Sequence, residues 1–427
     1  MRSAAALLAL VAVSPAGASP YEFHALPQGK DRPRVVFAPR PGSTACLTIS
    51  FRVGTMEQTR PGMTRLAQNL IVYANRTVPK EKLSLALFDG AAELKISTGL
   101  RRSSFTLVAP SGSFDGLAQL LLQAVFSPKV DRSRAPLAVR NTLLEGEGLD
   151  EVEQLNFFLG QIMAPEDGRF QPRRPLDTDE LVERAFPDAP RWFQTAFSPS
   201  NATLLFTGDV DVRAWTKRLN RFHGGTWKLG RDRPKLTTNI ARKMRSKSEL
   251  HLLVFPVTID RPQSSAAVRL ASAMLEDRLW QRFRQAGVGY TAEVRPLRTG
   301  WSDFLMLFLP AHDPSAISLA PFLVQEVREL RDGMTEEELE RNRALVLKQL
   351  EATDGDPELL AQELELADGS NSWFGAEVTE AVRTVAPAEL RKIYGRWLTE
   401  QNSIYLLFSP AKVASTDTSE LKRGWIK

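Results

Sequence analysis

The pattern of apolar positions in the first hundred residues predicts strands followed by a helix. Residues 34–39 and 46–54 form two short apolar segments joined through Pro-Gly-Ser, and the second alternates between apolar and polar side chains, as a half-buried strand does. In the stretch 61–77 the spacing changes to that of one helix face, with apolar side chains at Met63, Leu66, Ala67, Leu70, Ile71 and Ala74. The polar residues Arg65, Gln68 and Asn69 lie three and four positions apart, so they share a different face and could converge on one atom.

The rest of the chain repeats this arrangement. Strands are predicted at 93–98, 103–110, 202–211 (ending in a tight turn), 249–256, 304–310 and 402–410, and helices at 114–126, 134–158, 264–284, 316–332 and 387–398. Two passages resemble each other, since Asn201-Ala-Thr-Leu-Leu-Phe and Asn402-Ser-Ile-Tyr-Leu-Leu-Phe both follow a proline and a tryptophan. A repeat about 200 residues long indicates two tandem domains of one fold.

The first eighteen residues have the composition of a secretory signal peptide. Arg2 precedes an apolar run from Ala4 to Val13, and Ala16-Gly17-Ala18 provides a cleavage site. Cys46 is the only cysteine of the 427 residues, so an internal disulfide and a cysteine-based metal site are both excluded. We therefore expect an exported, periplasmic protein without an integral membrane segment after cleavage of residues 1–18.

The net charge of +5 comes largely from one segment. Residues 226–247 contain eight lysines and arginines and a single acidic residue, Asp232. Such a segment could contact an anionic surface or a nucleic acid. Because no aromatic residues interleave these charges and the protein is exported, we interpret the segment as a solvated interdomain linker and expect no nucleic-acid partner.

Several passages, taken in order, resemble the pitrilysin/insulinase family of zinc peptidases. Residues 34–37, 51–55 and 61–63 are similar to the strands and glycine turn before the family's metal helix, and residues 197–211 are similar to the end of its first domain. Residues 279–290 and 334–341 are similar to parts of its second domain. The resemblance implies an α+β fold of two tandem homologous domains, each a mostly antiparallel sheet of about six strands with helices packed on one face. The expected boundaries are 19–225 for the N-terminal domain, 226–247 for the linker and 248–427 for the C-terminal domain.

The family's H-x-x-E-H metal motif falls on Arg65-Leu66-Ala67-Gln68-Asn69. Arginine cannot bind a cation, asparagine is a poor zinc ligand, and glutamine cannot act as a general base. The family's third ligand, a downstream glutamate, falls near Glu145 and Glu147, which we interpret as a solvated helix face. The four histidines, His24, His223, His251 and His312, include no pair at i+3 or i+4. We therefore expect no metal and no catalytic residue in this chain.

The family also implies a substrate-binding arginine and tyrosine in the second domain, where the tyrosine hydroxyl stabilises the oxyanion across the active site. Tyr290 falls on the tyrosine position. The usual arginine position holds Phe283, and Arg282 and Arg284 lie on either side, so both remain candidates and Arg284 is preferred.

These expectations predict a non-catalytic, pseudo-peptidase subunit of a periplasmic zinc metalloendopeptidase. It would form half of a peptide chamber and supply Arg284 and Tyr290 in trans to a homologous partner subunit that holds the zinc, with a peptide or unfolded protein as substrate. Two alternatives remain open: a peptide-binding or assembly protein without a proteolytic partner, and a peptidase that is active by itself.

Overall fold

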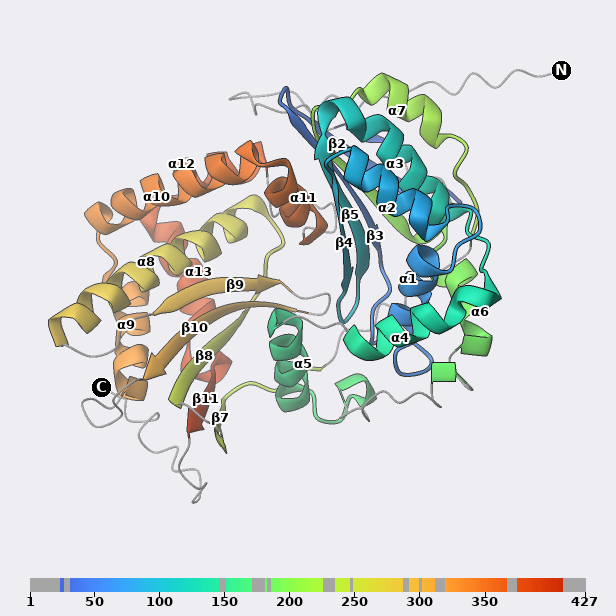
Figure 1. The fold of residues 1–427 in the computed structure, drawn as a ribbon. Coiled ribbons are helices and arrows are strands. Elements are labelled where there is room, and N and C mark those ends of the chain that lie inside the picture. The colour runs from blue at the N-terminus through green and yellow to red at the C-terminus, as the bar shows by residue number, and fades with distance from the viewer. Residues whose placement is uncertain are drawn as a thin grey trace. The chain divides into compact units, whose positions relative to one another are not determined.

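A computed structural model describes residues 24–26, 31–145, 151–170, 181–182, 186–225, 235–245, 249–286, 292–298, 302–311, 319–366 and 375–409. The chain forms two compact units (Figure 1). The first comprises residues 1–232 with 353–369, and the second comprises residues 233–352 with 370–427. The predicted signal peptide lies outside the described residues.

The first unit is built on a six-stranded sheet with the strand order β1-β2-β6-β3-β5-β4. Only β2 and β6 run parallel, so the sheet is mostly antiparallel. Its strands are β1 (His24–Leu26), β2 (Arg34–Pro39), β3 (Thr44–Phe51), β4 (Glu93–Thr98), β5 (Ser103–Pro110) and β6 (Ala202–Gly208).

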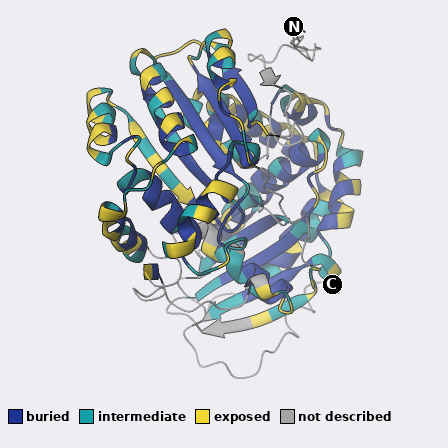
Figure 2. Ribbon diagram, turned by 90° about the vertical axis from the view of Figure 1, so that its right-hand side faces the viewer, coloured by how far each residue is buried: buried dark blue, intermediate teal, exposed yellow. Residues whose placement is uncertain are grey.

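One face of this sheet carries the core of the unit. The alternation predicted for β3 places Leu47, Ile49 and Phe51 in a buried cluster, where the Phe51 ring contacts those of Phe105 and Phe197. Figure 2 shows the strands as predominantly buried. The helices of the unit are α1 (Met63–Tyr73), α2 (Lys80–Asp89), α3 (Ser111–Phe126), α4 (Ala135–Glu145), α5 (Glu151–Met163), α6 (Phe186–Ala196), α7 (Val212–Leu219) and α11 (Pro357–Leu366).

Helix α11 covers part of the opposite face of the same sheet. The Ser50 hydroxyl of β3 donates to Glu365 Oε1 at 2.7 Å, and the Thr207 hydroxyl of β6 donates to the Pro357 carbonyl at 2.6 Å. Residues 353–369 therefore group with the first unit, although they lie within the range 248–427 that the sequence assigns to the C-terminal domain.

The second unit contains a five-stranded sheet with the order β7-β11-β8-β10-β9, in which only β7 and β11 run parallel. Its strands are β7 (Ile240–Arg245), β8 (Glu249–Val257), β9 (Glu293–Arg298), β10 (Asp303–Ala311) and β11 (Ile404–Ser409). Its helices are α8 (Pro262–Ala286), α9 (Leu319–Gly333), α10 (Glu336–Gly355), α12 (Ala376–Thr384) and α13 (Pro387–Trp397).

The two units share one topology. If β1 is set aside and the strands of each unit are numbered along the chain, both sheets have the order 1-5-2-4-3. The two repeated asparagines also make the same contact: Asn201 Nδ2 donates to the Ala196 carbonyl at 2.6 Å, and Asn402 Nδ2 donates to the Trp397 carbonyl at 2.7 Å. The predicted α+β class with two similar units is confirmed, with six strands in one described sheet and five in the other.

Two sequence interpretations need correction. Residues 240–245, assigned to the basic linker, form strand β7, because their backbone pairs in parallel with the apolar strand β11. An edge strand tolerates such basic residues, since one of its sides has no strand partner. The single helix predicted over 134–158 is instead two helices, α4 and α5, and the interrupting Gly146 and Gly148 lie outside the described residues. In the described part of the chain no helix is long and apolar enough to cross a membrane.

Candidate functional site

Helix α1 begins at a glycine whose backbone conformation suits few other residues. Gly62 is the N-cap and has φ 72°, in the left-handed region that glycine enters without steric cost. The helix then buries Leu66, Ala67 and Leu70 in the core of the first unit. The predicted polar face is consequently directed toward β4, β5 and α4, where Arg65, Gln68 and Asn69 all find partners.

Gln68 is fully buried and joins α1 to two strands. Its Nε2 donates to the carbonyl oxygens of Ser97 on β4 at 3.0 Å and Ser104 on β5 at 3.2 Å, and its Oε1 accepts from the Thr98 hydroxyl. Both amide hydrogens and the amide oxygen are therefore engaged. This side chain acts as a structural bridge and offers no proton acceptor for catalysis.

Asn69 lies one turn from Arg65 and contacts α4. Its Nδ2 donates to Thr142 Oγ1 at 3.0 Å and to Glu145 Oε2 at 3.3 Å. Because the Thr142 hydroxyl itself donates to the Ala138 carbonyl at 2.8 Å, it can only accept from Asn69, which fixes the orientation of the amide. Among the described residues, Asn69 Oδ1 is buried without a hydrogen-bond partner.

Arg65 places a cation beside the same carboxylate. Its Nε lies 2.7 Å from Glu145 Oε2, and its Nη1 donates at 3.3 Å both to the Ile96 carbonyl and to Thr98 Oγ1. The Arg65 side chain is 11% exposed and that of Glu145 is 36% exposed, so water screens the pair only in part.

The side chains at positions 65 and 69 thus meet at one atom, Glu145 Oε2. Glu145 is exposed, as a solvated helix face requires, but the last turn of α4 also brings its carboxylate to the polar face of α1. Glu147 lies outside the described residues.

The donor set of this cluster does not fit zinc. Zinc needs lone pairs from neutral imidazoles and carboxylates, whereas Arg65 brings a guanidinium cation to Glu145 and Asn69 brings an amide N–H donor. The guanidinium supplies the positive charge that a metal would bring. No group of three histidine, cysteine, aspartate or glutamate side chains suited to a metal occurs in the described residues.

The charges of this cluster also affect the pKa of one further side chain of α1. Tyr73 lies two turns after Arg65, and burial raises the pKa of its hydroxyl; the negative charge of Glu145 adds to the increase and the positive charge of Arg65 opposes it. Lys80 lies over the Tyr73 ring at 4.7 Å from the centroid.

Part of the chain matches a known protein family. Residues 188–346 match the family described as peptidase M16 inactive domain. The resemblance to the pitrilysin/insulinase peptidases is confirmed. A comparison with curated proteins by sequence found no match.

Solved M16-like structures share the fold over almost the whole chain. The first half of the periplasmic protease PqqL from Escherichia coli has a TM-score of 0.74 and 15% identity, covering 96% of this chain and 98% of that one. A protease from Helicobacter pylori has a TM-score of 0.73 and 12% identity, covering 91% and 100%. A peptidase M16 inactive domain from Pseudomonas fluorescens has a TM-score of 0.71 and 13% identity, covering 92% and 99%. At these identities the structures show the fold alone.

The two candidate arginines of α8 differ in their partners. Arg282 lies 3.2 Å from Glu326 and 3.3 Å from Glu329, so two carboxylates of α9 neutralise it. Arg284 is exposed, lies over the Trp280 ring at 5.6 Å from the centroid, and forms no ion pair with a described residue. The structure therefore leaves Arg284 the more available of the two. Tyr290 lies outside the described residues.

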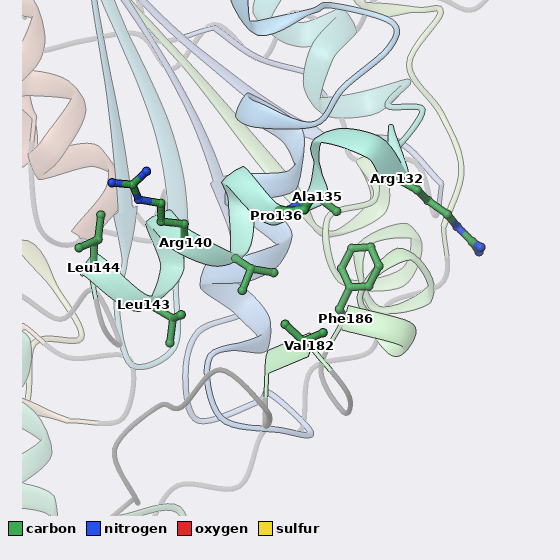
Figure 3. Close-up of a pocket in the computed structure, with 9 residues that line it drawn as sticks. Arg132, Ala135, Pro136, Arg140, Leu143, Leu144, Val182 and Phe186 are labelled. Atoms are coloured by element: carbon green, nitrogen blue, oxygen red, sulfur yellow. The ribbon is translucent and has the colours of Figure 1, made fainter.

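An apolar groove occurs elsewhere on the first unit, between α4 and the start of α6 (Figure 3). Its volume is about 540 Å³, and Leu144 and Val182 in its wall are 73% and 46% exposed. Arg132 and Arg140 lie at its two ends and point away from each other. The groove has no acid and base facing each other, so it is suited to contact and not to catalysis.

Sequence reasoning found the three motif positions but missed their partners. Thr98, Thr142 and Tyr73 complete the cluster. Of these three, only Tyr73 could have been found from the sequence, because it follows Asn69 by four residues on the same helix. The threonines are brought there by β4 and α4, through tertiary contacts that no local pattern records.

Proposed function

We propose that this chain is a non-catalytic subunit of a periplasmic zinc metalloendopeptidase. It forms half of a peptide chamber and supplies Arg284 and Tyr290 to a homologous, zinc-bearing partner subunit. The observation that carries this proposal is the cluster at Glu145 Oε2, where Arg65 and Asn69 take the places of the two metal-binding histidines. The match to an inactive-domain family and the fold shared with periplasmic M16 proteases support it.

The proposal assigns Arg284 to substrate because it is the arginine of the pair without a carboxylate partner in the described structure. A guanidinium can hold the backbone carbonyls or carboxylates of a bound peptide. The Tyr290 hydroxyl would donate a hydrogen bond to the oxyanion that develops during cleavage at the partner's zinc.

The test is to co-purify the chain with its partner from the native host, determine the metal content, and measure cleavage of an unfolded peptide. The isolated chain should contain no stoichiometric zinc and should not cleave. With the partner, Tyr290→Phe and Arg284→Met should lower kcat well beyond any loss of association, whereas Arg282→Met should have a smaller effect. Chelator-sensitive cleavage by the isolated chain would overturn the proposal, as would unchanged turnover in both variants.

A second candidate, an assembly role without proteolysis, is favoured by the groove of Figure 3. Its apolar wall, with an arginine at each end, would suit a protein partner whose apolar side chains are flanked by carboxylates. Leu144→Glu should then abolish co-purification of that partner, and the partner should have no peptidase activity. Co-purification of an active zinc peptidase would exclude this candidate.

A further inference from the structure

A cavity in the second unit lies where the topology repeats the degenerate metal site. In each unit a helix follows the second strand along the chain, setting β1 aside, and contacts the third: α1 contacts β4, and α8 contacts β9. The helices even make a matching contact, since Gln68 of α1 donates to the Ser97 carbonyl of β4 and Ser272 of α8 donates to the Val294 carbonyl of β9.

The two equivalent places differ in how far they are filled. In the first unit, Arg65, Gln68 and Asn69 occupy the space between α1, β4 and α4. In the second unit, a cavity of about 510 Å³ lies between α8, β9 and α10. It is lined by Arg269, Ser272, Ala273, Glu276, Asp277, Trp280, Gln281, Arg284, Val294, Pro296, Leu345 and Gln349.

One part of this cavity is negatively charged. Glu276 is half-buried, forms no ion pair with a described residue, and accepts a hydrogen bond from the Val294 backbone N–H. Burial raises the pKa of the Glu276 carboxyl, and the nearby charge of Glu293 raises it further. A cation bound at Glu276 would relieve both effects, because it favours the ionised carboxylate.

The rim two turns further along α8 is positively charged. Trp280 and Arg284 follow Glu276 at spacings of four and eight residues, so the three share one line of the helix surface. Asp277, the other acid of the lining, is already paired with Arg341 at 2.5 Å. Arg284, at the far end of this line, is exposed and forms no ion pair with a described residue, so it is available to a carboxylate.

The spacing of the two charges defines the size of a ligand. Eight residues of helix span about 12 Å, and three residues of extended peptide span about 10 Å. The lining between the two charges includes Trp280, Val294, Pro296 and Leu345, which offer apolar contacts. A peptide of this length would therefore have its side chains against apolar surface and its two ends at opposite charges.

We propose that this cavity binds short peptides with free ends, about three residues long and apolar in the middle, with the ammonium group at Glu276 and the carboxylate at Arg284. Such peptides are the chemical class that a peptidase releases. The inference rests on the proposed function in treating Arg284 as a peptide-binding residue, but it concerns the isolated chain and needs no partner.

Calorimetric titration of the isolated full chain tests this assignment with three probes: the tripeptide Ala-Leu-Ala, its N-acetylated form and its C-terminal amide. Removing either terminal charge should weaken binding about tenfold or more, because each terminus loses a charge-assisted hydrogen bond. The variant Glu276→Gln should bind the free and acetylated peptides equally, and Arg284→Met should bind the free peptide and the amide equally. Arg282→Met, whose side chain is paired with α9, serves as the matched control and should keep the preference for free ends.

Each other outcome is decisive. Failure of the folded wild-type chain to bind the tripeptide at millimolar concentration would overturn the inference, and so would equal affinity for all three probes. A preference for the free ammonium that survives Glu276→Gln would overturn the assignment of that end. Partner-dependent cleavage that persists while the tripeptide fails to bind would reject this cavity and leave the proposed function intact. Tripeptide binding by a chain that co-purifies with no zinc peptidase would reject the proposed function alone.

Discussion

If the cluster on α1 is a metal site that has lost its ligands, three substitutions should restore it. The change is Arg65→His, Gln68→Glu and Asn69→His, which rewrites residues 65–69 as H-x-x-E-H and leaves Glu145 as the third ligand. We expect this variant to bind one zinc ion per chain, whereas the wild-type chain binds none.

The distances in the structure support this expectation. Arg65 Nε and Asn69 Nδ2 lie 2.7 and 3.3 Å from Glu145 Oε2. Ligand atoms about 2.0–2.2 Å from a tetrahedral zinc ion lie roughly 3.3–3.6 Å from one another. Side chains at positions 65, 69 and 145 therefore already meet at nearly the separation that shared coordination requires.

Zinc binding should also stabilise the variant. At a free zinc concentration 100 times the Kd, a ligand that binds only the folded state contributes about 2.7 kcal/mol. For a unit of about 200 residues this corresponds to an increase in Tm of roughly 5–10 °C. Metal analysis after dialysis and thermal unfolding with and without zinc would measure both effects.

The matched control adds Glu145→Gln to the three substitutions, which removes the carboxylate ligand and keeps its size. This fourfold variant should retain little zinc and show no increase in Tm. If the threefold variant folds, as circular dichroism would show, but takes up no zinc, the cluster is not a former metal site. Zinc uptake that Glu145→Gln leaves unchanged would show that the metal binds elsewhere.

Three further measurements test the contacts on which these arguments depend. A double-mutant cycle with Arg65→Met and Glu145→Gln, measured by urea denaturation, should give a coupling energy of about 1–2 kcal/mol. This value lies between those for exposed and buried ion pairs. A coupling energy below about 0.3 kcal/mol would show that the ion pair does not contribute to stability. Burial raises the pKa of Cys46 to about 12. Iodoacetamide at pH 8 should therefore label the folded chain on the order of 10³ times more slowly than the urea-unfolded chain. Comparable labelling rates, measured by mass spectrometry, would contradict the burial of Cys46. Burial lowers the pKa of His251, whose ring contacts Tyr405 and Glu249, so the unfolded chain binds more protons than the folded chain below about pH 6.5. The second unit should therefore lose stability as the pH falls from 7 to 5, and His251→Gln should reduce this pH dependence in urea titrations. An unchanged pH dependence in the variant would assign the effect to other groups.

Much of the fold could be predicted from local patterns. Strand β3 and helix α1 follow directly from a change of apolar period from two to 3.6, and the repeat at Asn201 and Asn402 predicted two similar units. Strand β7 could not be predicted in this way, because its basic sequence resembles a linker and only its pairing with β11 defines it. The same holds for α11, whose contacts with the first unit come from a part of the chain about 150 residues later.

The candidate site, like the fold, could be predicted only in part from the sequence. The helical spacing predicted that Arg65, Gln68 and Asn69 share one face, and the structure confirms it. The resemblance placed the family's third ligand near Glu145, but the contact of this carboxylate with Arg65 was not predicted, because without the two histidines the sequence indicates no partner for it on α1. The structure shows this partner, because Glu145 Oε2 lies 2.7 Å from Arg65 Nε and 3.3 Å from Asn69 Nδ2.

The three replacements can be understood as one solution to a problem that the fold imposes. A helix beside β4 and β5 must satisfy the carbonyls of Ser97 and Ser104, and Gln68 donates to both, which a glutamate could not do. The carboxylate of Glu145 must be neutralised, and Arg65 does so without a metal. The contacts of Gln68 and Arg65 therefore hold α1 against the sheet and against α4. In the second unit, α8 and β9 are joined at Val294 by Ser272 and Glu276, and a cavity of about 510 Å³ lies beside these contacts, which is where we propose that a peptide binds.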